Sequence, residues 1–163
     1  MHIWMRNSGS TIPTESSMPK LPAPHPGLVI CYSYLWSQEH ARGRDEGVKD
    51  RPCAVVVARR VAEEKTIVTV VPVTHAPPSD ARAAIELPPR LKTHLGLDDR
   101  RSWIVLSEYN EFLWPGPDLR PVSSTSGGAF AYGVLPPGFF NRMRERLLEL
   151  ISERRVRHIR RTN

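Results

Sequence analysis

Two segments of this sequence place side chains that can hold a phosphate at the ends of expected strands. Arg51 stands before Pro52 and an apolar, β-branched run that ends at Ala58, and Thr74 and His75 close a second such run. Runs of this kind favour buried strands, and proline suits the first position of a strand because it has no N–H to donate. A guanidinium fixed at a strand entrance can bind a phosphate, while a hydroxyl and an imidazole can orient it and move protons.

The short turn between these runs predicts that Arg51 and Thr74 lie close together. Residues 62–65 are mostly charged, and a turn of this length joins two antiparallel strands into a hairpin. Arg51 precedes residue 63 by 12 positions and Thr74 follows it by 11, so the two are nearly opposite in the ladder unless a bulge intervenes. The alternative interpretation is that Arg51 only caps its strand beside Asp50.

Other side chains near these strand ends are candidates for the same site. Glu108 follows the apolar run 103–106, and it is either a base or ion-pair partner for Arg51, or an ordinary solvent-facing residue. His40 and His75 carry imidazoles, which titrate near neutral pH, although a loop histidine without a role is the simpler alternative. Aromatic rings at the strand ends suit either base stacking or core packing: Tyr34, Trp36, Tyr109, Phe112 and Trp114.

The composition is that of one soluble domain. A chain of 163 residues with 40% hydrophobic and 25% charged residues can bury its own core, and no apolar run approaches the ~20 residues of a membrane span. Serine, threonine and proline interrupt the N-terminus early, so no secretion signal is expected. Neither cysteine has a cysteine or histidine within four positions, which favours buried thiols over a metal site. We therefore expect a cytoplasmic protein without a membrane partner.

The net charge of +6 is concentrated at the C-terminus. Residues 142–163 contain eight arginines and three glutamates, a net +5, which leaves +1 for the rest of the chain. A basic end attracts nucleic acid without sequence preference. Alternatively, these charges belong to a solvated helix end, where cations are favourable.

Hydrophobic periodicity predicts a mainly β, α+β fold. Strands are expected over 27–36, 51–60, 66–74, 83–87, 102–112 and 129–134, with a helical turn over 90–95 and one amphipathic helix over 136–155. Short strands joined by hairpins close most simply into a small antiparallel barrel, because closure removes free edges. The expected organisation is a disordered or peripheral extension over 1–26, a barrel domain over 27–153 and a basic tail over 154–163.

Several stretches resemble the PemK/MazF family, the toxin partners of bacterial toxin–antitoxin pairs. Residues 27–30 are similar to the family's opening Gly-Asp-Ile-Val strand, with Leu28 in place of Asp. Residues 51–57 are similar to its Arg-Pro-x-Val-Val strand, and 71–74 look like its Val-Pro-Ile-Thr strand end. Weaker matches are 106–108, which resembles a segment with an acidic residue, and the terminal helix that follows 135–137.

The resemblance implies a fold, an activity and partners. The fold is an SH3-like barrel with a C-terminal helix, usually a homodimer, and the toxin is neutralised by a cognate antitoxin protein. The activity is cleavage of single-stranded RNA such as mRNA, without a metal or other cofactor, through attack of the ribose 2′-OH that leaves a 2′,3′-cyclic phosphate and a 5′-OH. Arg51 and Thr74 take the positions of the family's catalytic Arg and Thr, and Glu108 that of its acidic residue. The resemblance thus implies that Arg51 stabilises the charged phosphorane, that Thr74 orients the phosphate, and that Glu108 or, alternatively, His75 helps to remove the 2′-proton.

Residues around these three are expected to bind substrate. Glu46 keeps the family's five-residue spacing to Arg51, within a polar loop over 37–50 that is longer than usual. The expected substrate-binding residues are Trp36, His40, Glu46, His75 and Asn110. Two alternatives stay open. One is a non-catalytic module on the same barrel, which binds RNA or inhibits a protein as gyrase-directed toxins of this fold do, and the other is an inert remnant.

Overall fold

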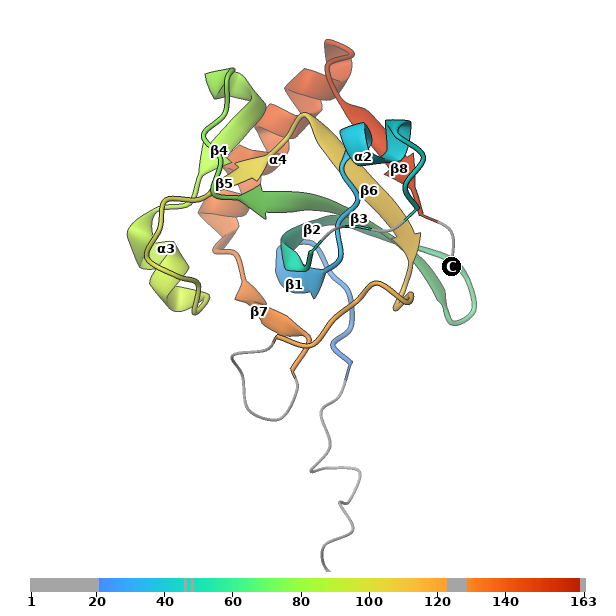
Figure 1. Cartoon of the computed structure of the whole chain (residues 1–163). Coiled ribbons are helices and arrows are strands. Elements are labelled where there is room, and N and C mark those ends of the chain that lie inside the picture. Colours follow the sequence, from blue (N-terminus) through green and yellow to red (C-terminus); the bar gives the residue numbers. More distant parts are fainter. Residues whose placement is uncertain (1–20, 46, 48, 123–128, 162–163) are drawn as a thin grey trace, which may run out of the picture.

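The computed structural model describes residues 21–45, 47, 49–122 and 129–161, which form a mainly antiparallel sheet with a helix near the C-terminus (Figure 1). The strands of this part of the chain are β1 (Leu28–Tyr32), β2 (Arg51–Ala62), β3 (Lys65–Thr74), β4 (Ala84–Glu86), β5 (Trp103–Val105), β6 (Glu108–Leu113), β7 (Ala131–Val134) and β8 (Arg157–Arg160). Its helical segments are α2 (Ser37–Ala41), the 3-10 turn η2 (Ala81–Ala83), α3 (Pro89–His94) and α4 (Pro137–Ser152). The predicted mainly β, α+β class is confirmed.

The strand β3 organises the sheet. The pairing order runs β4-β5-β3-β2-β1-β7, while β6 pairs with β3 and, in parallel, with β8. Residues 67–70 of β3 pair with β6, whereas Val73 and Thr74 pair with β5. The end of β3 therefore lies between β2 and β5. These pairings describe an open sheet, so closure into an SH3-like barrel stays a prediction.

The β2–β3 hairpin has the register that its turn predicts. Cys53 pairs with Pro72, so continuing the ladder by two residues places Arg51 opposite Thr74. Irregularities occur between Val55 and Val57 and again near the turn, but they shift the register without separating the ends of the hairpin. The expected approach of Arg51 and Thr74 is confirmed.

Alternating side chains fill two apolar layers on opposite faces of the sheet. Leu28, Ile30, Tyr32 and Tyr34 share one layer, because successive side chains of a strand point to opposite faces. The other layer lies between the sheet and α4 (Figure 1), and the helix contributes Phe139, Met143, Leu147 and Leu150. Ile151, near the end of the helix, is 44% exposed, whereas Phe139 is buried at its start.

The strand expected over 102–112 is in fact two strands. β5 pairs with β4 and the end of β3, whereas β6 pairs with the first part of β3 and with β8. At the break, the N–H of Leu106 donates to the carbonyl oxygen of Ala83 (2.7 Å), and the carbonyl oxygen of Ser107 accepts from the N–H of Arg157 (3.0 Å). The chain changes hydrogen-bond partners at this point, and a continuous apolar pattern does not record such a change.

Both segments that were expected to be irregular contain regular elements. The helix α2 opens the loop 37–50, and β8 lies within the expected basic tail 154–163, where Ile159 is buried. α2 lies beside β8 (Figure 1), so the two unpredicted elements support each other. Most of the expected extension over 1–26 lies outside the described residues. Within the described residues, no helix has the length and apolar character needed to cross a membrane.

Candidate functional site

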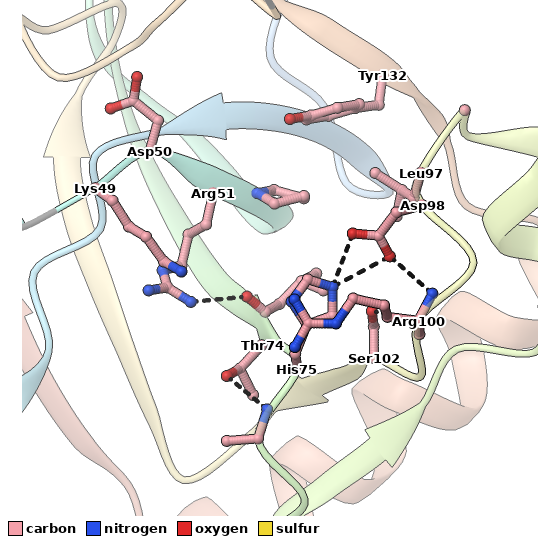
Figure 2. A pocket seen from close by; sticks show the side chains of 14 residues that line it. Lys49, Asp50, Arg51, Thr74, His75, Leu97, Asp98, Arg100, Ser102 and Tyr132 are labelled. Atoms are coloured by element: carbon pink, nitrogen blue, oxygen red, sulfur yellow. Dashed lines mark hydrogen bonds and ion pairs between the residues drawn. The ribbon is translucent and has the colours of Figure 1, made fainter. Parts of the chain in front are cut away.

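A hollow of about 670 Å³ opens where the start of β2 meets the end of β3 (Figure 2). Its lining comes from residues 49–52, residues 73–76, the segment 96–102 before β5, and Tyr132 of β7. The cationic side chains of the lining are Lys49, Arg51 and Arg100, and the acidic ones are Asp50 and Asp98. With three cations against two carboxylates, the hollow favours an anionic ligand.

Arg51 is held from two sides at the mouth of β2. Its Nη1 donates to the carbonyl oxygen of Val73 (3.2 Å), and its guanidinium lies over the ring of Trp36, 4.9 Å from the centroid. Its Nε is buried and has no hydrogen-bond partner among the described residues. Buried donors in folded proteins are normally satisfied, so this unpaired N–H is an unmet hydrogen-bonding group at the edge of the hollow.

Thr74 and His75 present a hydroxyl and an imidazole beside Arg51. The hydroxyl oxygen of Thr74 accepts from the N–H of Ala76 (3.1 Å), which fixes it at the strand end while its proton remains available to a ligand. Nε2 of His75 lies 3.1 Å from Oδ1 and 2.9 Å from Oδ2 of Asp98 (Figure 2). The Arg51 guanidinium, the Thr74 hydroxyl and the His75 imidazole therefore line the same hollow, as the sequence predicts.

Asp98 is fixed by several donors besides His75. Lys92 Nζ donates to its Oδ1 (2.9 Å), as does the N–H of Arg100 (3.1 Å). The hydrogen bond from Lys92, followed by those from His75 and Arg100, lowers the pKa of Asp98 to about 2. The carboxylate therefore stays charged at all but strongly acidic pH. On the facing wall, burial raises the pKa of Tyr132, so its phenol stays protonated as a hydrogen-bond donor.

A second hollow, of about 520 Å³, adjoins the first at the start of β2 and the end of β3. Both are lined by Arg51, Thr74 and Ala76. The second hollow adds the ring of Trp36 and polar and proline side chains from α2 and the loop after β3, among them Gln38, Pro77, Pro78 and Ser79. Arg51 and Thr74 therefore stand at the junction of two adjoining hollows rather than at the end of one.

Glu108 lines neither hollow. One carboxylate oxygen accepts from the Tyr34 hydroxyl (3.1 Å) and from the N–H of Ser37 (2.8 Å), and the other accepts from the Ser37 hydroxyl (3.1 Å). A carboxylate on the first N–H of a helix satisfies an otherwise unpaired donor. Glu108 thus holds the start of α2, and with it the adjacent Trp36, rather than standing beside Arg51 and Thr74 as expected.

The other expected substrate-binding residues separate into three groups. Trp36 and His75 line the hollows. Asn110 is fully buried and lines neither hollow, and its amide group hydrogen-bonds the backbone of Leu35 (2.9 and 2.8 Å), so the structure does not bring it to the hollows. His40 is exposed on α2 and lines neither hollow. Glu46 lies outside the described residues.

Sequence reasoning missed Asp98 and Lys92. Both lie about twenty residues after His75, in the segment around α3, and no spacing pattern connects them to the hairpin. The Gly96 turn between them, with φ of 68°, allows the chain to double back toward β3, and this is the one local signal. Across the described residues, no group of three or more His, Cys, Asp or Glu side chains is arranged to hold a metal ion.

Comparison of the chain with protein-family models, with curated proteins and with solved structures finds no match.

Proposed function

We propose that this protein is an endoribonuclease of the PemK/MazF toxin type, which cleaves single-stranded RNA at a phosphate bound between Arg51 and Thr74. The observation that carries this proposal is the junction of the two hollows. A chain of nucleotides crossing it would place one nucleotide in each hollow and the phosphate that links them on Arg51 and Thr74. Trp36, backed by the Arg51 guanidinium, offers a ring on which an unpaired base can stack.

The reaction needs only groups that the RNA and this site supply. The ribose 2′-oxygen attacks the adjacent phosphorus and loses its proton, the P–O5′ bond breaks, and the products are a 2′,3′-cyclic phosphate and a 5′-OH. Arg51 would stabilise the negative charge that grows on the phosphoryl oxygens, and its free Nε–H is a donor for that purpose. The Thr74 hydroxyl would hold the phosphate in line for attack.

Partners and barrel closure belong to the same proposal. A toxin of this type closes its sheet into an SH3-like barrel, forms a homodimer and is neutralised by a cognate antitoxin in the cytoplasm. One observation favours the second candidate, a non-catalytic RNA-binding or gyrase-inhibiting module. Glu108, the acidic residue that the resemblance assigns to catalysis, is committed to α2. A site without that carboxylate would bind a phosphate without cleaving it.

A cleavage assay with purified protein and a pool of long single-stranded RNA distinguishes these two candidates. We expect cleavage in the presence of EDTA, and none of the same RNA carrying 2′-O-methyl groups, because the attacking oxygen is then blocked. Electrophoresis of the labelled RNA reports both results. Binding of the RNA without cleavage would favour the non-catalytic module, and cleavage of the methylated RNA would exclude attack by the 2′-oxygen.

A further inference from the structure

His75 and Asp98 form a fixed pair on the wall of the first hollow, next to the proposed phosphate position (Figure 2). We propose that His75 is the general base of the cleavage, and that Asp98, anchored by the buried Lys92, positions it. This assignment rests on the proposed function. His75 would take the role of proton acceptor that the resemblance gives to Glu108. Glu108 is poorly placed for that role, because Tyr34 and Ser37 engage both oxygens of its carboxylate.

The ring of His75 has one nitrogen committed and one available. Nε2 faces both oxygens of Asp98, at 3.1 and 2.9 Å, whereas Nδ1 has no partner among the described residues. A charged carboxylate on Nε2 favours the tautomer with the proton on that nitrogen, which leaves the lone pair on Nδ1 for substrate. Because His75 directly follows Thr74, the base and the phosphate-holding hydroxyl are set by the same strand end.

Lys92 makes this orientation rigid. Its side chain is only 6% exposed, and its ammonium donates to Asp98, to the hydroxyl of Ser102 (2.8 Å) and to the carbonyl oxygen of Arg100. All three of its protons are thus used, so it serves as an anchor and not as a phosphate ligand. By contrast, Glu86 and Arg101 form a comparable ion pair at 2.8 Å that lines neither hollow.

The proton balance of the step closes within the site. Nδ1 of His75 takes the 2′-proton while the O2′–P bond forms, O5′ leaves with the electron pair of the broken bond and takes a proton from water, and His75 returns its proton to solvent. The other charged or titratable groups on this hollow are Lys49, Asp50, Arg51, Arg100 and Tyr132. Among the described residues, no carboxylate is paired with any of these cations or with the Tyr132 phenol as Asp98 is paired with His75.

Three variants of the full chain test the assignment. His75→Gln should lower kcat by about 100-fold or more, the scale of general-base catalysis, and leave binding of the 2′-O-methyl RNA within about twofold. Asp98→Asn should lower kcat by about tenfold and leave KM within about twofold, because the imidazole loses the carboxylate that fixes its orientation. Asp99→Asn, an exposed carboxylate one residue along, is the matched control and should behave as wild type.

Kinetics between about pH 5 and pH 9 with single-stranded RNA in EDTA give all three results. If wild type cleaves and His75→Gln cleaves equally well, the base assignment is overturned while the proposed function stands. If Asp98→Asn leaves kcat unchanged, or changes KM alone, the positioning role is overturned. Absence of cleavage by wild type would remove the proposed function and the base assignment together.

Discussion

Replacing Arg51 with alanine is expected to lower kcat for RNA cleavage by about 100- to 1000-fold. Among the described residues, Arg51 is the cation that lines both hollows. The carbonyl oxygen of Val73 and the ring of Trp36 hold its guanidinium in place. Its loss removes the donor facing the growing phosphoryl charge. Because alanine also removes a buried Nε–H without a partner, the fold should lose little stability, about 1 kcal/mol for the bond to Val73.

Two further variants separate the role of Arg51 from charge and from strand propensity. Arg51→Lys keeps a positive charge but not the planar fork, and should recover only part of the rate. Arg59→Ala changes an exposed arginine on the same strand, toward the hairpin turn, and should leave kcat unchanged. Initial rates on one RNA, with circular dichroism to verify folding, provide the comparison. Equal rates for a folded Arg51→Ala and wild type would contradict the proposed phosphate site.

The largest expected effect on stability comes from Arg161. Its guanidinium is almost fully buried and pairs with Asp118 (2.7 Å), while Nη1 donates to the carbonyl oxygen of Ser33 (2.9 Å) and to Oδ1 of Asn110 (3.1 Å). Alanine would leave Asp118 with only the longer pairing to Arg120 (3.8 Å) and would remove the donor to Ser33 and Asn110. Breaking a buried pair of this kind costs about 3 to 5 kcal/mol. For a chain of this size that lowers Tm by roughly 10 °C.

Arg160 provides the control for this prediction. It is the last residue of β8 and pairs with Glu111 of β6 at 3.3 Å, but its side chain is 79% exposed, so Arg160→Ala should change stability by about 0.5 kcal/mol or less. Urea unfolding of both variants measures the difference. A midpoint for Arg161→Ala as high as that for Arg160→Ala would show that β8 is not fastened to the domain by this arginine.

The Arg161 contacts also give Glu108 and Asn110 a common role. Glu108 binds Ser37, Asn110 binds Leu35, and Arg161 binds Ser33, so β6 and the residue after β8 hold every second residue of the segment that carries Trp36. Two residues expected at the site therefore hold the segment whose Trp36 ring lies against Arg51.

Local patterns account for what could be predicted from the sequence. The turn length set the register that brings Arg51 opposite Thr74, and the alternation in β1 set which side chains share a layer. The missed elements depend on distant contacts. α2 has only five residues and starts on the carboxylate of Glu108, while β8 is arginine-rich and becomes a strand by pairing with β6. Asp98 reaches His75 through a turn, and no periodicity predicts that contact.

The most direct test of the proposed activity is the chemical identity of the ends that the protein makes. Purified wild-type protein is incubated with a defined single-stranded RNA in the presence of EDTA, and the masses of the fragments are measured by mass spectrometry. Attack by the 2′-oxygen at the Arg51–Thr74 junction predicts a 2′,3′-cyclic phosphate on one fragment and a 5′-hydroxyl on the other. Fragments with a 3′-hydroxyl and a 5′-phosphate, or RNA that remains intact, would contradict it.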